Sequence, residues 1–210
     1  WAQRRAIDIH RLGPHSCTPE QSLLAQLALH GVTAADVKTL VLTHLHYDHC
    51  GNCRDLPDAR IIVQRSELMA AAAPMGPPAL TIGGKSLFYD RADVAELVDP
   101  LWERLDLIEG DIQLFPGIAC VLYADTHTPG HQCVYVQTEK GVAAIVGDIA
   151  RKNKLDAGGI ASLLSSQKDT IASALPADFA TTLGTSAPAM QSASEPKPVV
   201  CVPRADMPNL

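Results

Sequence analysis

A histidine-rich segment constrains this chain more than any other feature of its sequence. Residues 43–49 read Thr-His-Leu-His-Tyr-Asp-His. They follow a short β-prone apolar run at 39–43, of the kind that is buried between helices. We therefore expect several side chains able to ligate a metal ion at the C-terminal end of one buried strand.

The spacing within this segment predicts two pairs of metal ligands. Residues i and i+2 of an extended chain point to the same side, so His44 and His46 can bind one ion together. Asp48 and His49 lie beyond the strand end and can turn toward a second ion. A surface loop that is rich in histidine by chance is the alternative, and a motif this short and dense argues against it.

Two later segments carry further candidate ligands. A Pro-Gly turn at 129–130 projects His131 from a loop, which suits a third imidazole on the first ion. Asp148 follows an apolar strand expected at 142–146, where a carboxylate on its own would be costly to bury. A position between two cations would remove that cost.

The rest of the chain predicts a layered α/β architecture. Further strands are expected at 60–64, 112–115, 118–123 and 133–138, the last forming a hairpin with 142–146. Helices are expected at 19–30, 66–73, 94–107 and 160–175, with Trp102 on a face toward the core. Residues 74–84, rich in Pro and Gly, read as a loop or lid.

Composition and charge narrow the function classes. A net charge of −6 without a basic run argues against a nucleic-acid partner. No apolar stretch reaches the ~18 residues of a membrane span and no signal-peptide core is visible, so we expect a cytoplasmic protein without a membrane partner. We expect one domain at 1–183 and a Ser/Ala/Pro-rich tail at 184–210 that buries little.

The cysteines do not form the dense pattern of a disulfide-stapled domain. Six are scattered through 210 residues, so we expect mostly free thiols. Cys50 and Cys53 form a lone CxxC, which is either a redox or metal motif or simply two buried small side chains.

The motifs together resemble the metallo-β-lactamase superfamily. They are HxHxDH at 44–49, PGH at 129–131 and GD at 147–148. The segments at 61–67, 108–111, 115–117 and 127–132 are similar to the N-acyl-homoserine lactonase branch, so that the resemblance covers residues 18–150. It implies an αββα sandwich.

The resemblance implies a zinc-dependent hydrolase that opens a lactone ring, such as that of an acyl-homoserine lactone, by attack of a metal-bound hydroxide. One or two zinc ions per chain are expected. The implied ligands are His44, His46 and His131 on the first ion, Asp48 and His49 on the second, and Asp148 between them. Asp48 would pass a proton to the leaving alkoxide.

Three neighbouring residues have two interpretations each. His127 is either hydrogen-bonded near the ligands or a histidine that stabilises its turn. Tyr47 either faces the substrate or packs beneath the loop. Arg151 stands where the lactonase branch has a substrate-binding tyrosine, and it is either an oxyanion-stabilising cation or a solvated residue.

The sequence also departs from the family pattern. No histidine follows His131, although the family has a C-terminal histidine ligand, and the aligned residue would be Thr185 or Ala205. Residues 1–17 show no strand pair upstream of the first helix, so part of the N-terminal strands is expected to be missing. The alternatives are thus a degenerate metal-binding domain without turnover, or a thioester or ester hydrolase of the same superfamily. An oligomer is compatible with the sequence.

Overall fold

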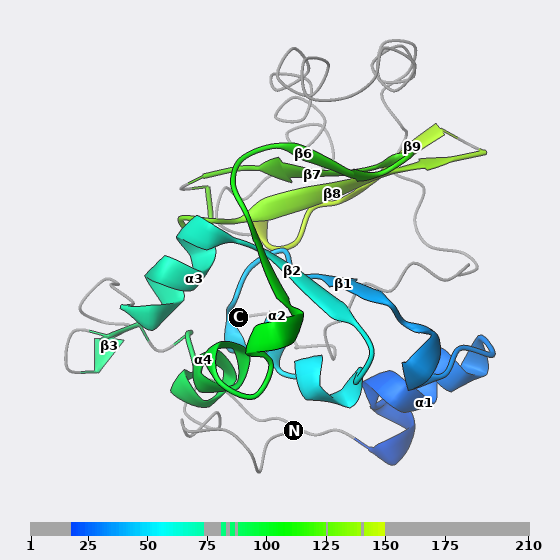
Figure 1. Cartoon of the computed structure of the whole chain (residues 1–210), viewed down its shortest axis with the longest axis horizontal. Helices are drawn as coiled ribbons and strands as arrows, with labels where there is room; N and C mark the ends of the chain where they lie inside the picture. The colour runs from blue at the N-terminus through cyan, green and yellow to red at the C-terminus, as the bar shows by residue number, and fades with distance from the viewer. Residues whose placement is uncertain are drawn as a thin grey trace. The chain divides into compact units, whose positions relative to one another are not determined.

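The computed structural model describes residues 18–73, 81–82, 85–86, 88–124, 126–139 and 141–149 (Figure 1). The chain divides into two compact units. The first unit contains the described parts of Trp1–Val63 and Leu68–Leu107. The second unit contains Gln64–Glu67 and the described part of Ile108–Lys197.

The first unit begins with the helix expected at 19–30, which is divided in two. A 3-10 turn at Pro19–Gln21 precedes helix α1 (Leu23–Leu29). Ser22 separates them because its backbone is extended, with φ −65° and ψ 151°, and its hydroxyl accepts a hydrogen bond from the Ala25 N–H at 3.3 Å. Gly31, with φ 70°, lies just beyond the helix end as the sequence indicates.

A three-stranded sheet in the order β1-β2-β5 supports the histidine segment. Strands β1 (Thr39–Val41) and β2 (Arg60–Gln64) are parallel, with Leu40 opposite Ile61. Both strands were expected from the sequence, and β2 has the expected bounds. The buried core of this unit includes Leu27, Leu40, Leu42, Leu45, Leu56, Ile61, Val63, Leu97 and Leu101.

The prediction of a helix at 94–107 is wrong for the second half of this range. Helix α4 (Arg91–Val98) is followed by a 3-10 turn at Trp102–Arg104 and then by strand β5 (Leu105–Ile108). Pro100 explains the break, because a proline disfavours helical geometry in the residue before it, and Asp99 has φ −123° and ψ −82°. Trp102 is 54% exposed, so its expected packing against the core is also wrong.

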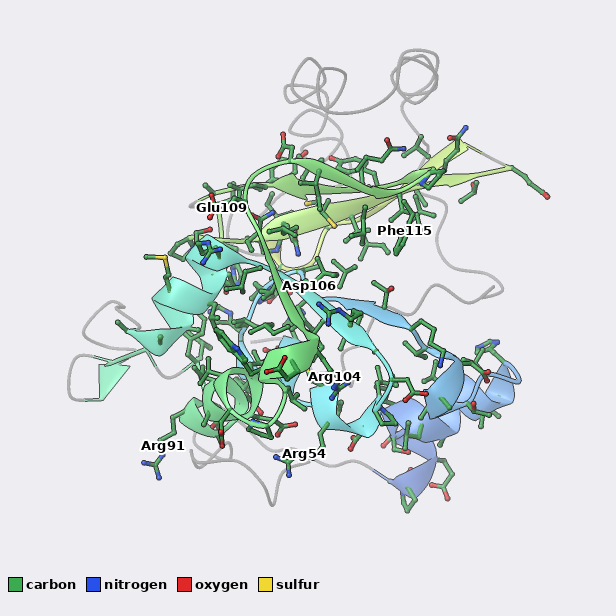
Figure 2. All side chains as sticks on the ribbon, in the orientation of Figure 1. Arg54, Arg91, Arg104, Asp106, Glu109 and Phe115 are labelled. Carbon is green, nitrogen blue, oxygen red and sulfur yellow. The ribbon has the colours of Figure 1, made fainter. Side chains whose placement is uncertain are left out.

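An alternation of side chains identifies β5 as a strand. Leu105 and Leu107 pack against the core, whereas Asp106 accepts a hydrogen bond from Arg60 Nε at 2.9 Å (Figure 2). This period of two is typical of a half-buried strand.

Four further elements lie between β1 and α4 in the chain, and the start of one of them, residues 65–67, groups with the second unit. Helix α2 (Tyr47–Cys50) lies within the histidine segment, and helix α3 (Arg65–Ala72), expected at 66–73, follows β2. Strands β3 (Thr81–Ile82) and β4 (Lys85–Ser86) form an antiparallel pair, so the segment expected as a loop at 74–84 contains strand residues. The rest of that segment lies outside the described residues.

The second unit is a four-stranded antiparallel sheet in the order β6-β7-β8-β9 (Figure 1). Its strands are β6 (Ile112–Phe115), β7 (Ile118–Leu122), β8 (Gln132–Thr138) and β9 (Gly141–Ile145). All four were expected within one residue at each end, and β8 and β9 form the expected hairpin with Thr138 opposite Gly141. The buried core comprises Ala119, Val121, Tyr123, Cys133, Tyr135, Val142 and Ile149.

Several expectations fall outside the described residues. These are the helix at 160–175 and the boundary between a domain at 1–183 and a tail at 184–210. None of the helices within the described ranges has the length and apolar character needed to cross a bilayer.

The cysteines of the CxxC pair are core residues. Cys50 and Cys53 are 5% and 3% exposed, and neither forms a disulfide. Their thiols donate to carbonyl oxygens, Cys50 to Leu45 at 3.5 Å and Cys53 to Cys50 at 3.2 Å. Burial raises the pKa of Cys53 from 9.0 to about 12, with nearby Glu96 and Asp93 adding to the shift. A thiol held protonated in this way suits packing and not redox or metal chemistry.

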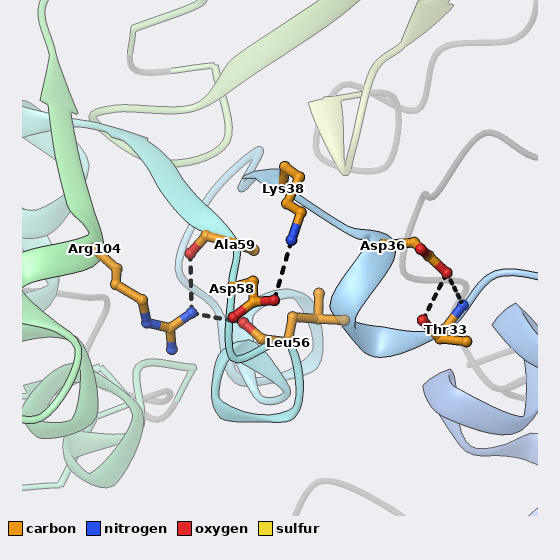
Figure 3. Close-up of polar contacts among 7 residues, drawn as sticks. All are labelled: Thr33, Asp36, Lys38, Leu56, Asp58, Ala59 and Arg104. Carbon is orange, nitrogen blue, oxygen red and sulfur yellow. Dashed lines mark hydrogen bonds and ion pairs between the residues drawn. The ribbon is translucent and has the colours of Figure 1, made fainter.

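The connection that leads into β2 is held by two kinds of polar contact (Figure 3). Arg104 Nη1 donates to the carbonyl oxygens of Leu56 and Ala59 at 2.6 and 2.9 Å. Lys38 Nζ lies 3.1 Å from Asp58 Oδ2, with both side chains more than half exposed. The first contact satisfies partly buried carbonyls, whereas the second is screened by solvent.

We predict that Arg104→Ala lowers the free energy of unfolding by about 2 kcal/mol, since two carbonyls lose a charged donor. The matched change Lys38→Ala should cost less than about 0.5 kcal/mol, because an exposed ion pair contributes little. Urea unfolding of the full chain measures both. Equal effects of the two changes would contradict the role given to Arg104.

The Cys53 thiol should make stability depend on alkaline pH. Its folded-state pKa is raised, so its contribution is complete below the unfolded pKa of 9.0 and is lost as pH rises toward about 12. Between pH 8 and pH 10 the wild-type chain should lose about 1 to 2 kcal/mol more than Cys53→Ala. Denaturant unfolding at both pH values measures the difference, and parallel losses in the two proteins would count against it.

Candidate metal centre

The imidazoles of the histidine segment lie close together in the first unit. His44 is fully buried and His46 is 9% exposed. The ring centroids of His44 and His46 are 4.7 Å apart with an interplanar angle of 81°. Those of His44 and His49 are 4.1 Å apart. The sequence thus brings three imidazoles together within a few residues of one strand end.

The local backbone explains how His49 returns to His44. His46 is extended, with φ −65° and ψ 148°, and begins the short helix α2. The His49 N–H donates to the His46 carbonyl oxygen at 2.9 Å, which closes the turn. The chain therefore changes from a strand-like to a helical path between the second and third histidines, as expected for residues beyond a strand end.

Polar and aromatic neighbours orient these rings. Thr43 Oγ1 lies 3.2 Å from His44 Nδ1, so a hydrogen bond engages this nitrogen of the ring. The rings of Phe88 and Tyr89 lie 5.2 and 4.9 Å from that of His46. Fixed rings lose less conformational freedom when they bind an ion.

Asp48 adds a carboxylate to the cluster. Its Oδ2 lies 3.6 Å from His49 Nε2, and both side chains are about one-fifth exposed. The neighbouring Tyr47 is 3% exposed and its N–H donates to the Phe88 carbonyl oxygen at 2.9 Å. This burial supports the packing interpretation of Tyr47.

The second unit brings together the other three candidate residues. His131 is fully buried, and its ring centroid lies 5.8 Å from that of His127. His127 Nε2 lies 3.8 Å from Asp148 Oδ2. Asp148 follows β9 after Gly147, which has φ 53° and so turns the chain. His127 is therefore a neighbour of both expected ligands, and its role stays a prediction.

The donor set of each unit fits zinc. Imidazole nitrogens and carboxylate oxygens are ligands that zinc accepts, whereas calcium and magnesium prefer oxygen alone. Arg151 and the two positions that could replace the family's C-terminal histidine, Thr185 and Ala205, lie outside the described residues.

The sequence interpretation missed two buried polar residues of the second unit. Glu67 is fully buried, and its carboxylate accepts a hydrogen bond from the Gly130 N–H at 2.9 Å. Gln64 is 1% exposed and contacts Gly110 and Gln132. In the sequence, their segment is distinguished only by its likeness to the lactonase branch. The sequence signal that could have identified them is their position, since Gln64 ends an apolar strand and Glu67 follows three residues later.

Comparison with known proteins identifies the family. The model of the metallo-beta-lactamase superfamily matches residues 16–187. An N-acyl homoserine lactonase of Bacillus cereus is 30% identical over 123 residues, which are 59% of this chain and 42% of that protein. The lactonase AttM of Rhizobium radiobacter is 32% identical over 120 residues, 56% of this chain and 43% of that protein. The chain spans less than half the length of these relatives.

Solved structures support the same fold. An N-acyl homoserine lactone hydrolase with N-hexanoyl-L-homoserine at its catalytic metal centre is 25% identical, with a TM-score of 0.50 over 63% of this chain and 46% of that chain. The dizinc quorum-quenching lactonase AidC shows the fold with a TM-score of 0.52 at 20% identity, over 64% and 48% of the two chains. The chain belongs to the metallo-beta-lactamase superfamily.

Proposed function

We propose that this chain is a zinc-dependent hydrolase that opens a lactone ring of the acyl-homoserine lactone type. One observation carries the proposal: the imidazole cluster of His44, His46 and His49 at the end of β1, with His44 and His46 buried, in a chain of this superfamily. The names of the curated relatives and of the solved structures support the substrate class.

The ligand assignment follows the family motif. His44, His46 and His131 would hold a first zinc ion, with Asp48 and His49 at a second and Asp148 shared between them. The ring distances within 44–49 support the part of this set that lies in the first unit. The joint role of residues from the two units rests on the motif.

Zinc, when bound, lowers the pKa of a water molecule toward neutrality and polarises a substrate carbonyl. The protein residues supply the rest. Asp48, partly exposed beside His49, would hold a proton at Oδ2 and deliver it to the departing alkoxide. Burial of His44 and His46 would keep bulk water from the ligating atoms.

A metal-binding domain without turnover is the alternative with a specific observation behind it. Thr185 or Ala205 is the residue that aligns with the family's C-terminal histidine ligand, and neither side chain is an imidazole. A second metal site with one ligand fewer would bind its ion less tightly. Thioester or other ester substrates are the remaining alternative within the superfamily.

We predict that His46→Ala removes the first metal ion, because a tetrahedral site deprived of one imidazole rarely stays closed. The matched control is His30→Ala, which changes an exposed histidine at the end of α1. Elemental analysis of both variants after zinc loading and desalting measures the ion, with circular dichroism to verify folding. Zinc content that stays at the wild-type value in folded His46→Ala would refute the assignment.

We predict that Asp48→Asn lowers the rate of lactone opening by about 10²- to 10⁴-fold, since the amide cannot transfer the proton. Wild type and variant are assayed on a panel of acyl-homoserine lactones, simple esters and thioesters. Hydrolysis of the lactones above the buffer rate supports the proposed substrate class. A preference for thioesters would instead support the thioester hydrolase alternative. Zinc uptake without hydrolysis of any substrate favours the non-catalytic alternative.

A further inference from the structure

The first residues of α3 belong to a different unit from the rest of that helix. Gln64–Glu67 group with the second unit, whereas the preceding strand residues and the chain from Leu68 group with the first. The short segment therefore groups with the sheet whose strand β8 begins just after His131. Two of its side chains, Gln64 and Glu67, are buried and polar.

Glu67 binds the backbone immediately before His131. Its Oε2 accepts a hydrogen bond from the Gly130 N–H at 2.9 Å. The approach is as close as a backbone allows, because a Cβ atom added to Gly130 would lie 2.2 Å from the Glu67 nitrogen and 2.6 Å from its Cα. Only glycine fits this contact, which explains the residue type at the turn.

Gln64 binds the residue immediately after His131. Its Nε2 donates to Gln132 Oε1 at 3.1 Å and to the Gly110 carbonyl oxygen at 2.7 Å, while its Oε1 accepts from the Gly110 N–H at 3.0 Å. Both glutamine side chains are essentially unexposed. A side-chain amide with three hydrogen bonds has one orientation, so the Gln64 amide in turn fixes the side chain of Gln132.

The backbone of His131 itself is held by the second unit. Its N–H donates to the Thr128 carbonyl oxygen at 3.3 Å, and its carbonyl oxygen accepts from the Tyr123 N–H at 2.7 Å. Positions 130, 131 and 132 are therefore each fixed by a separate hydrogen bond. The contact at 130 is the one made by an ionisable side chain, and a bond to a carboxylate is stronger than one between neutral groups.

We propose that Glu67, assisted by Gln64, is a positioning residue for the imidazole of His131. The inference rests on the proposed function in so far as His131 is taken as a zinc ligand. Glu67 holds the Pro-Gly turn in the geometry from which that ring leaves the backbone. Loss of the oxygen that accepts from Gly130 lets the turn relax, and the His131 ring must then be ordered before it can hold the ion.

The test measures zinc affinity by chelator competition in full-length Glu67→Ala, Glu67→Gln and Glu67→Asp. The matched control is Glu109→Ala, which removes an exposed carboxylate of the same unit that pairs with Arg65 (Figure 2). Substitution with cobalt adds an absorption spectrum that reports ligand geometry, and circular dichroism identifies the folded variants.

Glu67→Ala should weaken zinc binding about 10- to 100-fold and shift the cobalt spectrum. Glu67→Gln keeps an oxygen that accepts from Gly130, so its zinc affinity should stay within about 3-fold of wild type. If Glu67 acted only through its negative charge, the glutamine variant would not recover this affinity. Glu67→Asp, one methylene shorter, should bind less tightly than Glu67→Gln. If Glu67→Ala does not fold, the Asp and Gln variants decide the matter. Equal affinities in folded Ala, Asp and Gln variants would overturn the proposal.

Amide hydrogen exchange of the metal-free protein separates this inference from the proposed function. The Gly130 amide should exchange at least about 10-fold faster in Glu67→Ala than in wild type, and Glu109→Ala should leave it unchanged. If the wild-type chain takes up no zinc, the proposed function is refuted. The exchange rates still test whether Glu67 orders the turn. Unchanged exchange at Gly130 in a folded Glu67→Ala overturns the positioning role in either case.

Discussion

The parallel pairing of β1 with β2 is the interaction on which the histidine segment depends. Strand β1 has three residues, and the Leu42 N–H extends its contact with β2 by donating to the Ile62 carbonyl oxygen at 3.0 Å. Leu42 and Leu45 are buried on either side of His44, so the segment enters the core before its backbone leaves the strand. Packing of these two leucines therefore places His44 in the core next to the strand end.

Most of the fold follows from local patterns in the sequence. The strands of the second unit alternate or run apolar between turn residues, which is why β6 to β9 were predicted closely. The prediction failed where two patterns competed, because Leu101 and Leu105 have the spacing of a helix face, whereas Leu105 and Leu107 have the spacing of a strand face. The partner that decides between them, Arg60, lies far away in the sequence.

The part of the candidate site that depends only on residue type and spacing could be predicted from the sequence. Histidines spaced by two, and a third after a Pro-Gly turn, indicate a metal site without any knowledge of packing. The support for that turn was not predictable, since Gln64 and Glu67 act through backbone groups of Gly110 and Gly130 more than forty residues away. A hydrogen bond from a main-chain amide leaves no trace in the partner's residue type, except where close approach demands glycine.

The exchange of Gln64–Glu67 between units has a consequence for dissecting this protein. Within the described residues, the chain crosses from one unit to the other at 63/64, 67/68 and 107/108, so no single cut separates them. A fragment that starts at Ile108 would contain the Pro-Gly loop without Glu67, whose carboxylate binds the Gly130 N–H. A fragment that stops at Leu107 would contain Glu67 without this hydrogen-bond partner. Expression of either half alone is therefore a poor substitute for mutagenesis in the intact polypeptide.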